Sequence, residues 1–382
     1  MANTKSPEIL IIGGGVIGLS IARELHKKGV WQITIVEKGR CGEESSWAAG
    51  GMLGPQAEAD ESGAFFDICS ASRDLYPDLA AELLDETGID IELDRSGTLY
   101  LAFTDEDVRE IRERYEWQRK AGLAVERLSA DESRRAEPFV SPNVREALFF
   151  PNDWQVENRK LCAALRRYAE LNGIEIRENT HVERLIVKNG IVTGVETQTD
   201  RITADTTILT TGAWTSLIKV GLAQMPVKIE PVRGQMVVFQ AAKRLFERVI
   251  YSPRGYIVPR VDGRILAGST SENVGFDKSL TDAAANRLRE MANEIAPALA
   301  AMPIADHWSG LRPYAFDGLP VLGPSEGLGG LFFAVGHYRN GILLAPWTAR
   351  LTAECLINGK SSEYLKMFGP DRFKLRGVGT GS

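Results

Sequence analysis

Three glycines near the start of the chain have the spacing of a pyrophosphate-binding turn. Gly13, Gly15 and Gly18 directly follow the apolar run 8–12, and apolar residues then recur at helical spacing up to Gly29. In such a turn the first glycine permits the bend, the second lets the backbone approach a pyrophosphate, and the third allows close packing of helix on strand. The helix N-terminus adds free N–H groups and the positive end of its dipole. The pattern therefore predicts a dinucleotide site.

An acidic residue stands where the ribose of such a dinucleotide lies. A second apolar strand, predicted over 32–36, ends at Glu37. A carboxylate at this position accepts a hydrogen bond from a ribose hydroxyl, and it would repel the 2′-phosphate of NADP. A glycine-rich turn in an unrelated α/β protein is the alternative, but strand, glycines, helix, strand and acid all fall in register.

The next segment favours FAD over NAD. An NAD dehydrogenase usually continues with further βα units, whereas residues 38–58 form a loop rich in Ser, Ala and Gly that includes Ser45, Ser46, Gly50 and Gly51. Small residues let a backbone lie against a large flat ligand. The loop also contains large apolar residues, which argues against a flexible surface loop.

The composition argues against several classes of function. The 382 residues predict two or three domains, and a net charge of −6 without a long basic run argues against a nucleic-acid partner. Four isolated cysteines suit a reducing compartment, and the four histidines lack metal-ligand spacing, so we expect no metal. The apolar stretch 9–22 lacks the flanks of a signal peptide, and no apolar run is long enough to cross a bilayer. We therefore expect a cytoplasmic protein without an integral membrane segment.

The order of the predicted elements indicates an inserted domain. Helices are expected over 72–88, 105–121, 159–172 and 281–296 and after Gly341, and strands over 174–178, 182–187, 191–196, 206–211, 235–239, 255–260, 264–268 and 331–335. Dinucleotide-type elements thus stand at the start, middle and end, with antiparallel β-rich material between them. The expected fold is α/β, mixed with α+β: a discontinuous Rossmann-like FAD-binding domain with an inserted, β-rich antiparallel substrate domain. The expected FAD-binding parts are 1–90, 150–225 and 318–382, and the substrate-binding parts are 91–149 and 226–317.

Several blocks of the chain together resemble the D-amino-acid oxidase superfamily of FAD-dependent oxidoreductases. They are the N-terminal glycine turn, the loop 45–53, the blocks 310–313 and 317–318, and the segment 336–344. Within the superfamily, the blocks 49–53, 256–260 and 337–346 are most similar to glycine oxidases of the thiamine-pathway type. The resemblance covers nearly the whole chain. It implies that a flavin held by one domain faces a β-rich substrate domain.

The resemblance implies FAD contacts that are spread along the chain. Val16 and Ile17 would lie at the pyrophosphate, Glu37 and Lys38 at the adenosine ribose, and Val182 at adenine. The full set of implied cofactor residues is Gly13, Gly15, Val16, Ile17, Gly18, Glu37, Lys38, Ser45, Ser46, Gly50, Gly51, Met52, Val182, Gly212, His337, Tyr338, Arg339, Asn340, Gly341, Ile342 and Leu343. The helix that begins near residue 341 can place N–H groups and its positive dipole end at flavin N1 and O2. No cysteine stands near the block after Arg312, where related sarcosine oxidases attach their flavin covalently, so the resemblance implies non-covalent FAD.

Arg312 is the predicted ligand of a substrate carboxylate, because the planar guanidinium matches a carboxylate with two parallel hydrogen bonds. The resemblance implies the same role for this position. It also implies that Tyr256 adds a hydroxyl hydrogen bond and that Arg339 lines the same pocket, together with Gly51 and Met52. The alternative for each polar residue is structural: an arginine that binds loop carbonyls, or a tyrosine packed in a sheet.

The implied reaction is the oxidative deamination of glycine or of another small amine or D-amino acid. The α-hydrogen leaves as a hydride to flavin N5, the imine hydrolyses to a 2-oxo acid and ammonia, and molecular oxygen reoxidises the flavin to give hydrogen peroxide. Whether the product supplies thiamine thiazole synthesis is left open. We also expect a homo-oligomer.

Two departures from the family pattern leave the preferred substrate open. Arg254 and Ser271 stand where the glycine oxidase type has His and Met, and both are expected to face or flank the substrate pocket. The alternative function is that of an FAD-dependent D-amino-acid, sarcosine or proline dehydrogenase that passes electrons to an acceptor other than oxygen. A flavoprotein that binds without turnover is the third hypothesis.

Overall fold

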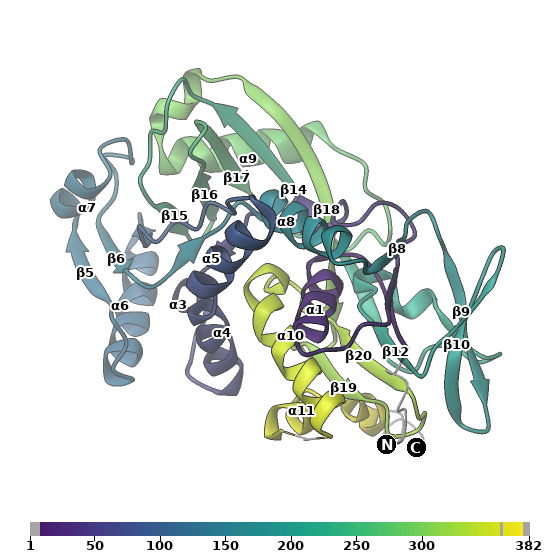
Figure 1. Cartoon of the computed structure of the whole chain (residues 1–382). Coiled ribbons are helices and arrows are strands. Elements are labelled where there is room, and N and C mark those ends of the chain that lie inside the picture. The colour runs from purple at the N-terminus through teal and green to yellow at the C-terminus, as the bar shows by residue number, and fades with distance from the viewer. Residues whose placement is uncertain (1–7, 360–361, 377–382) are drawn as a thin grey trace, which may run out of the picture.

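A parallel sheet and a larger, mainly antiparallel sheet dominate the structure (Figure 1). The computed structural model describes residues 8–359 and 362–376, so the outermost parts of the expected FAD-binding segments lie outside the described residues. The fold is mixed α/β, as the sequence predicted. The expected division into two domains remains a prediction, although the strands of the two large sheets come from the segments that the sequence assigned to different domains.

The parallel sheet contains the elements that the glycine turn predicted. Its strands, in spatial order, are β19 (Val321–Pro324), β20 (Leu331–Val335), β12 (Thr206–Leu209), β1 (Ile9–Ile12), β2 (Ile33–Val36) and β8 (Glu175–Arg177). All neighbours are parallel except β19 and β20. Helix α1 (Val16–Lys27) connects β1 to β2, and every residue of β1 is buried. Parallel pairing requires such a crossover, which explains the strand–helix–strand order read from the sequence.

The larger sheet contains eight strands and lies beside the parallel sheet. Its spatial order is β18 (Ile304–Ala315), β14 (Ile229–Gln240), β17 (Arg264–Gly268), β16 (Gly255–Pro259), β15 (Val249–Ser252), β4 (Thr98–Ala102), β6 (Glu146–Phe150) and β5 (Glu126–Ser129). Its pairs are antiparallel except β15 and β4. Helix α9 (Asp282–Ile295) covers one face, where Leu288 and Met291 pack against Val237 and Ile257. On the opposite face, Met236 and Tyr256 belong to a separate hydrophobic cluster, and both line the cavity described below.

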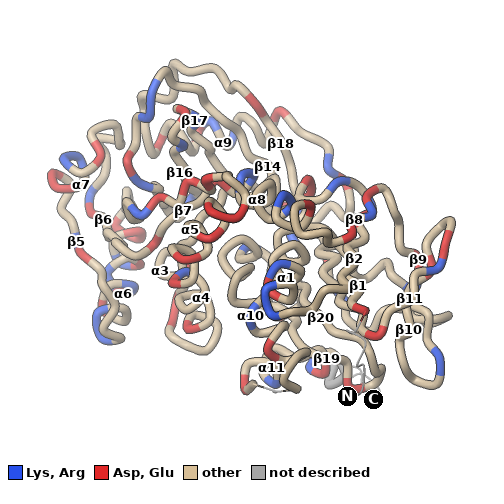
Figure 2. Tube along the Cα trace, viewed as in Figure 1, with Lys and Arg blue, Asp and Glu red and all other residues tan. Residues whose placement is uncertain are grey.

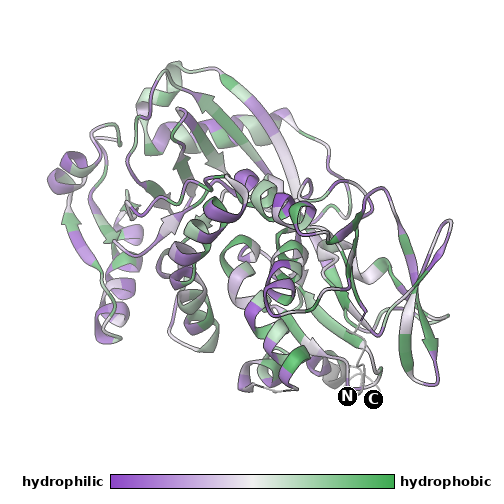
Figure 3. Ribbon diagram, viewed as in Figure 1, coloured by the Kyte–Doolittle hydropathy of each residue, from purple (hydrophilic) through white to green (hydrophobic). Residues whose placement is uncertain are grey.

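The remaining sheets and helices connect and cover these two parts. The smaller sheets are β11 (Arg201–Thr203), β10 (Ile191–Thr197), β9 (Val182–Lys188) and β13 (Lys219–Val220), and the pair β3 (Met52–Leu53) and β7 (Trp154–Gln155). The other helices are α2 (Ser45–Ala48), α3 (Pro55–Glu58), α4 (Ala64–Asp74), α5 (Tyr76–Thr87), α6 (Asp105–Lys120), α7 (Ala130–Ala136), α8 (Asn158–Leu171), α10 (Gly341–Asn358) and α11 (Glu363–Met367), with 3-10 turns at Gly212–Leu217, Pro297–Ala301 and Pro370–Arg376. In Figure 3 the strands β19 and β20 are largely hydrophobic, whereas α6 and α7 are hydrophilic on their visible faces.

Two sequence predictions about helices need correction. The helix expected over 72–88 is two helices, α4 and α5, because Pro77 lies in the first turn of α5 and favours a helix start. The loop expected over 38–58 contains the short elements α2, β3 and α3. Figure 2 shows basic residues on α1 and acidic residues on α5. Arg23 and Lys27 of α1 form ion pairs with Glu82 of α5. These ion pairs help to hold α5 against α1, the helix that connects β1 to β2 of the parallel sheet.

Candidate active site

A long cavity lies where the two large sheets meet, and residues from widely separated segments line it. The expected cofactor and substrate residues that line it are Gly13, Gly15, Val16, Ile17, Glu37, Lys38, Ser45, Ser46, Gly50, Gly51, Met52, Val182, Gly212, Tyr256, Arg312, His337, Tyr338, Arg339, Asn340, Gly341 and Ile342. Four expected residues are not among its lining residues: Gly18, Leu343, Arg254 and Ser271. The structure thus gathers most of the predicted site residues around one space.

The glycine turn forms one end of this cavity and is held by Glu37. The carboxylate of Glu37 accepts hydrogen bonds from the backbone N–H of Gly14 at 2.8 Å and of Gly39 at 2.9 Å. Gly18 packs inside the turn, where a Cβ would lie 2.0 Å from the carbonyl oxygen of Gly13. A larger residue at this position would push the helix away from the strand. Glu37 therefore shapes the turn as well as facing the cavity.

The first turn of α1 meets a hydroxyl group at the same end. The Oγ of Ser46 accepts a hydrogen bond from the backbone N–H of Val16 at 3.0 Å, and no side chain caps the helix at Gly15. A Cβ on Gly15 would lie 3.3 Å from this Oγ. The open, positive end of a helix dipole next to a hydroxyl is suited to a phosphate group. This geometry fits the pyrophosphate of a dinucleotide.

The N-terminus of α10 points at the opposite part of the cavity. Asn340, Gly341 and Ile342 line the space, and the side chain of Asn340 does not cap the helix. The first backbone N–H groups of a helix have no partner within it, so they can bind a ligand. Leu343 lies one residue deeper, and its carbonyl accepts a hydrogen bond from Ser72 Oγ at 2.6 Å. Its backbone is thus tied to α4.

His337 is a neutral residue in this part of the cavity wall. Its ring Nε2 lies 3.1 Å from Thr348 Oγ1, and the side chain is buried. Burial lowers the pKa of His337 from 6.5 to about 3. An uncharged imidazole next to the α10 N-terminus leaves the helix dipole as the source of positive potential there.

Two glycines leave room for a flat ring near the substrate side. Gly51 has a φ of +72°, and a Cβ there would lie 2.1 Å from the carbonyl oxygen of Val156. A Cβ on Gly50 would point toward Tyr256 and Met236, at 3.5 Å and 3.7 Å. Both glycines line the cavity. A phosphate site, a helix terminus and a glycine-lined wall thus lie along one cavity, which fits FAD.

Arg312 lies on β18 with its guanidinium at the cavity. Its Nη1 donates to the carbonyl oxygen of Thr270 at 3.1 Å, and its Nη2 donates to Ser269 Oγ at 2.7 Å. Both acceptors are uncharged. Among the described residues, no carboxylate forms an ion pair with Arg312. Its charge is therefore available to a ligand.

Tyr256 lies on β16 and faces the same part of the cavity. Its side chain is buried, and its hydroxyl has only a weak contact to the sulfur of Met236 at 3.9 Å. The ring of Tyr251 packs against it at a tilt of 34°, with ring centroids 5.6 Å apart. A buried hydroxyl with such a weak partner can still donate a hydrogen bond to a ligand.

Arg339 lines the cavity, and its guanidinium is paired with other side chains of the protein. Its guanidinium donates to both carboxylate oxygens of Glu58, at 3.1 Å and 2.8 Å, and to the hydroxyl of Tyr251 at 2.7 Å. The hydroxyl of Tyr251 also donates to Glu58 at 2.7 Å. Burial raises the pKa of Glu58, but Arg339 and Tyr251 outweigh this effect and hold the pKa below its ordinary value. The charge of Arg339 is therefore already compensated.

The two residues that depart from the family pattern do not line the cavity. Arg254 forms ion pairs with Asp107 at 2.8 Å and Glu294 at 3.2 Å, which hold its guanidinium between α6 and α9. Ser271 is exposed, and Ser269 lines the cavity instead. Neither residue faces the cavity directly, and the expectation that they flank the substrate pocket stays a prediction.

Sequence reasoning did not identify Glu58, Tyr251, Trp214 or Ser269. Trp214 lines the cavity next to Lys38, whose ammonium lies 3.3 Å from the centre of the indole ring. Its position two residues after the expected Gly212 was a usable signal. No local pattern marks Glu58, because its partner Arg339 is 281 residues away.

Comparison with known proteins agrees with the geometry of the site. The model of the FAD dependent oxidoreductase family matches residues 8–355, so the chain belongs to this family. It is an enzyme of the FAD-dependent oxidoreductase class, with FAD as its cofactor.

The chain is similar to glycine oxidases over nearly its whole length. It is 37% identical to a glycine oxidase of Pseudomonas aeruginosa, over 93% of this chain and 96% of that protein. A Bifunctional protein ThiO/ThiG of Trichormus variabilis is 36% identical over 96% of this chain, which spans 55% of that protein. A crystal structure of glycine oxidase from Geobacillus kaustophilus superposes with a TM-score of 0.88 at 34% identity, covering 96% and 98% of the two chains. The structure of L-proline dehydrogenase from P. horikoshii has a TM-score of 0.85 at 26% identity, covering 98% and 99%.

The part of the chain that the structure describes contains neither a membrane-spanning helix nor a cluster of metal-binding side chains. No helix within 8–359 and 362–376 has the length and apolar character needed to cross a membrane. Within the same residues, no group of three or more His, Cys, Asp or Glu side chains is placed to hold a metal ion.

Proposed function

We propose that this enzyme oxidatively deaminates glycine or another small amine that bears a carboxylate. The observation that supports the proposal most directly is Arg312, a cavity-lining guanidinium held by the neutral acceptors Ser269 and Thr270. Because Glu58 compensates the charge of Arg339, Arg312 is the guanidinium of the cavity wall that a substrate carboxylate can pair with. The similarity to glycine oxidases supports glycine as the substrate.

The residues of the chain bind and orient the substrate in this proposal. Arg312 holds the carboxylate through two parallel hydrogen bonds, and the hydroxyl of Tyr256 donates a further one. Gly50 and Gly51 have no side chains to fill the cavity, so the α-carbon of the substrate can lie close to the isoalloxazine ring. When bound, FAD would supply the two-electron oxidation of the α-carbon, and molecular oxygen would take up the electron pair and be reduced to hydrogen peroxide. Hydrolysis of the imine product with one water then gives the 2-oxo acid and ammonia.

The chain also holds FAD without a covalent bond in this proposal. Cys41, Cys69, Cys162 and Cys355 are free thiols, and none is among the lining residues of the cavity. We further propose that the product of the reaction supplies thiamine thiazole synthesis. We also propose that the enzyme is a homo-oligomer and that it is located in the cytoplasm.

An anaerobic screen of flavin reduction tests the proposed activity. Glycine, sarcosine, D-alanine and D-proline are each added to the enzyme with bound FAD, and bleaching of the flavin is recorded before and after air is admitted. We expect glycine to bleach the flavin, and air to restore its absorbance with release of hydrogen peroxide. Bleaching without peroxide would instead support a dehydrogenase, an alternative favoured by the fold similarity to L-proline dehydrogenase. No bleaching by any of these compounds would refute the proposal.

The variants Arg312→Ala and Arg312→Lys locate the carboxylate site. Both should keep their FAD, because Arg312 lies on the substrate side of the cavity. Alanine should abolish reduction by glycine, whereas lysine should retain a small part of it, since an ammonium supplies charge without the bidentate geometry. Unchanged reduction by glycine in Arg312→Ala would place the carboxylate elsewhere.

A further inference from the structure

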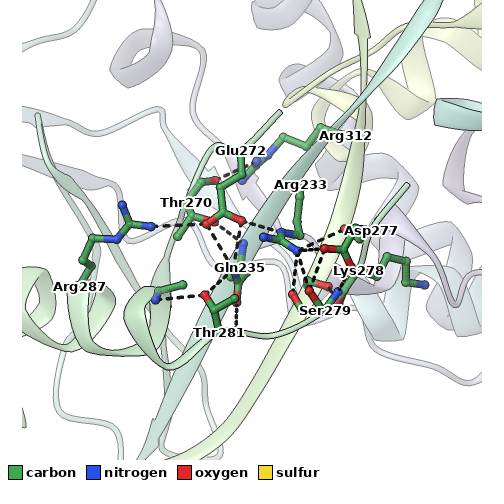
Figure 4. A network of polar contacts seen from close by, with 12 residues as sticks. Arg233, Gln235, Thr270, Glu272, Asp277, Lys278, Ser279, Thr281, Arg287 and Arg312 are labelled. Carbon is green, nitrogen blue, oxygen red and sulfur yellow. Dashed lines mark hydrogen bonds and ion pairs between the residues drawn. The ribbon is translucent and has the colours of Figure 1, made fainter. Parts of the chain in front are cut away.

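A buried polar network lies on the side of β14 that faces away from the cavity. Arg233 and Gln235 alternate along this strand with Gly234 and Met236, and the latter two line the cavity. Because successive side chains of a strand point to opposite faces, Arg233 and Gln235 point away from the substrate. Figure 4 shows them in contact with the segment 269–281, which follows β17.

This segment orients Arg312. The two hydrogen bonds from the guanidinium of Arg312 go to Ser269 Oγ and to the carbonyl oxygen of Thr270. Both acceptors belong to irregular chain immediately after β17. The position of the guanidinium therefore depends on how firmly residues 269 and 270 are held.

Backbone hydrogen bonds attach the segment to β14. The N–H of Thr270 donates to the carbonyl oxygen of Gln235 at 3.2 Å, and the N–H of Gln235 donates to Thr270 Oγ1 at 2.9 Å. Arg233 and Glu272 exchange two backbone hydrogen bonds of 2.9 Å. These contacts occur on the strand that also forms the cavity wall.

The side chain of Arg233 connects the segment at two further points. Its Nε donates to Glu272 Oε2 at 2.6 Å, and its Nη1 donates to Asp277 Oδ2 at 2.9 Å. Nη1 also donates to the carbonyl oxygen and the Oγ of Ser279, both at 3.0 Å. The side chain of Arg233 is 6% exposed and that of Glu272 is 16% exposed. A buried guanidinium thus binds the start and the middle of one segment to β14.

We propose that Arg233 and Glu272 are positioning residues for the substrate carboxylate. They touch neither the substrate nor the cofactor, and they act by holding Ser269 and Thr270 where these residues orient Arg312. The inference rests on the proposed function in one respect, which is that Arg312 binds a carboxylate.

Acetate binding tests this inference without turnover. Acetate carries the carboxylate of the substrate but no amine, and its binding next to the flavin can be followed by the absorbance of the enzyme with bound FAD. In Arg233→Gln we expect the dissociation constant of acetate to rise about tenfold, as for other small misplacements of a binding group. The apparent dissociation constant of glycine in anaerobic reduction should rise by a similar factor. The limiting rate of flavin reduction should change much less.

A double variant separates positioning from folding. Removal of one partner of a buried ion pair leaves an uncompensated charge, so Arg233→Gln alone can lower stability. The double variant Arg233→Gln with Glu272→Gln removes both charges and keeps a polar, hydrogen-bonding side chain at each position. It should retain wild-type FAD content and thermal unfolding midpoint, yet still bind acetate more weakly than wild type.

Arg287→Gln is the matched control, because this arginine also contacts Glu272, at 3.4 Å, but its side chain is 65% exposed. Its acetate affinity should equal that of wild type.

The inference would be overturned if the dissociation constant of acetate in both Arg233 variants stayed within about twofold of wild type, because this change lies well below the effect of misplacement. If glycine fails to reduce wild-type flavin, the proposed activity is wrong, but acetate titration still decides the inference. If wild-type enzyme does not bind acetate, the carboxylate site at Arg312 is wrong and the inference falls with it.

Discussion

Gly234 of β14 provides the space in which the guanidinium of Arg312 lies. A Cβ on Gly234 would lie 2.3 Å from both Nη atoms of Arg312. Arg312 pairs with Val232 across the two strands, so it shares a sheet face with Gly234. Arg312, the proposed ligand of the carboxylate, can therefore occupy its position only because residue 234 is a glycine.

We expect Gly234→Ala to weaken substrate binding more than it weakens the fold. The atoms that a methyl group would meet belong to the end of a flexible side chain, which can move aside at small cost. Arg312 would then lose its contacts to Ser269 and Thr270. The KM for glycine should rise about tenfold or more, with FAD content retained, which steady-state kinetics and the flavin absorbance of the purified enzyme can measure.

Gly327→Ala is the control for this substitution, because a Cβ there meets no atom within 4 Å. Its KM for glycine should match that of wild type. An unchanged KM in Gly234→Ala would show that Arg312 does not need this space.

Glu58→Gln should change which substrates the enzyme accepts. The substitution removes the charge that compensates Arg339 and leaves a second guanidinium next to the cavity. A dicarboxylic amine such as iminodiacetate could then pair with both arginines. We expect its KM to fall relative to that of glycine in Glu58→Gln, measured by peroxide release or flavin reduction. A parallel loss of activity toward both substrates would instead show that Glu58 serves the reaction itself.

His337 should make the protein less stable in acid. Its pKa in the folded state is about 3, against an ordinary value of 6.5. Between these values the unfolded chain binds a proton that the folded chain excludes, so the free energy of unfolding falls as the pH is lowered. This residue contributes a slope of up to about 1.4 kcal/mol per pH unit in that window.

Denaturant unfolding of wild type and of His337→Gln at several pH values measures this contribution. Gln keeps a neutral hydrogen-bonding side chain next to Thr348 but does not titrate. The stability of the variant should therefore depend less on pH below 6.5. Parallel pH profiles would show that His337 is protonated in the folded protein.

Gly51 and Gly50 should respond differently to the same substitution. Gly51→Ala forces a residue with a Cβ into a left-handed conformation, which costs about 1–2 kcal/mol before the clash with the carbonyl of Val156 is counted. Its free energy of unfolding and its FAD content should both fall. Gly50→Ala places a methyl group at ordinary contact distance from Tyr256, so its stability should be near that of wild type. A stable Gly51→Ala enzyme with full FAD content would contradict this account.

The parts of the site that follow one another in sequence could be predicted from local patterns. The glycine turn lies between β1 and α1 because three glycines, an apolar run and a helical repeat stand next to each other. The start of α10 was predictable for the same reason, because the apolar run of β20 ends at Val335 and a short segment with two glycines leads from it into the helix. Such signals need no knowledge of distant residues.

Contacts between distant residues could not be read from the sequence. The charge of Arg339 is compensated by Glu58, and Arg254 pairs with Asp107, and these partners are 281 and 147 residues apart. Whether an arginine is free for a ligand depends on such a partner, which composition and spacing do not reveal. The long strand β18 was also not predicted, because charged and polar residues interrupt its apolar pattern.

The strand order of the parallel sheet makes the cofactor site depend on segments that are synthesised at very different times. β12 lies between β1, from the start of the chain, and β20, from near its end. A nascent chain that stops before residue 331 has the glycine turn but neither the last strand nor the N-terminus of α10. We expect such a chain to have an incomplete cofactor site and to leave one edge of β12 without its partner strand. The position of β20 thus makes the assembled FAD site depend on a strand that comes late in this sequence.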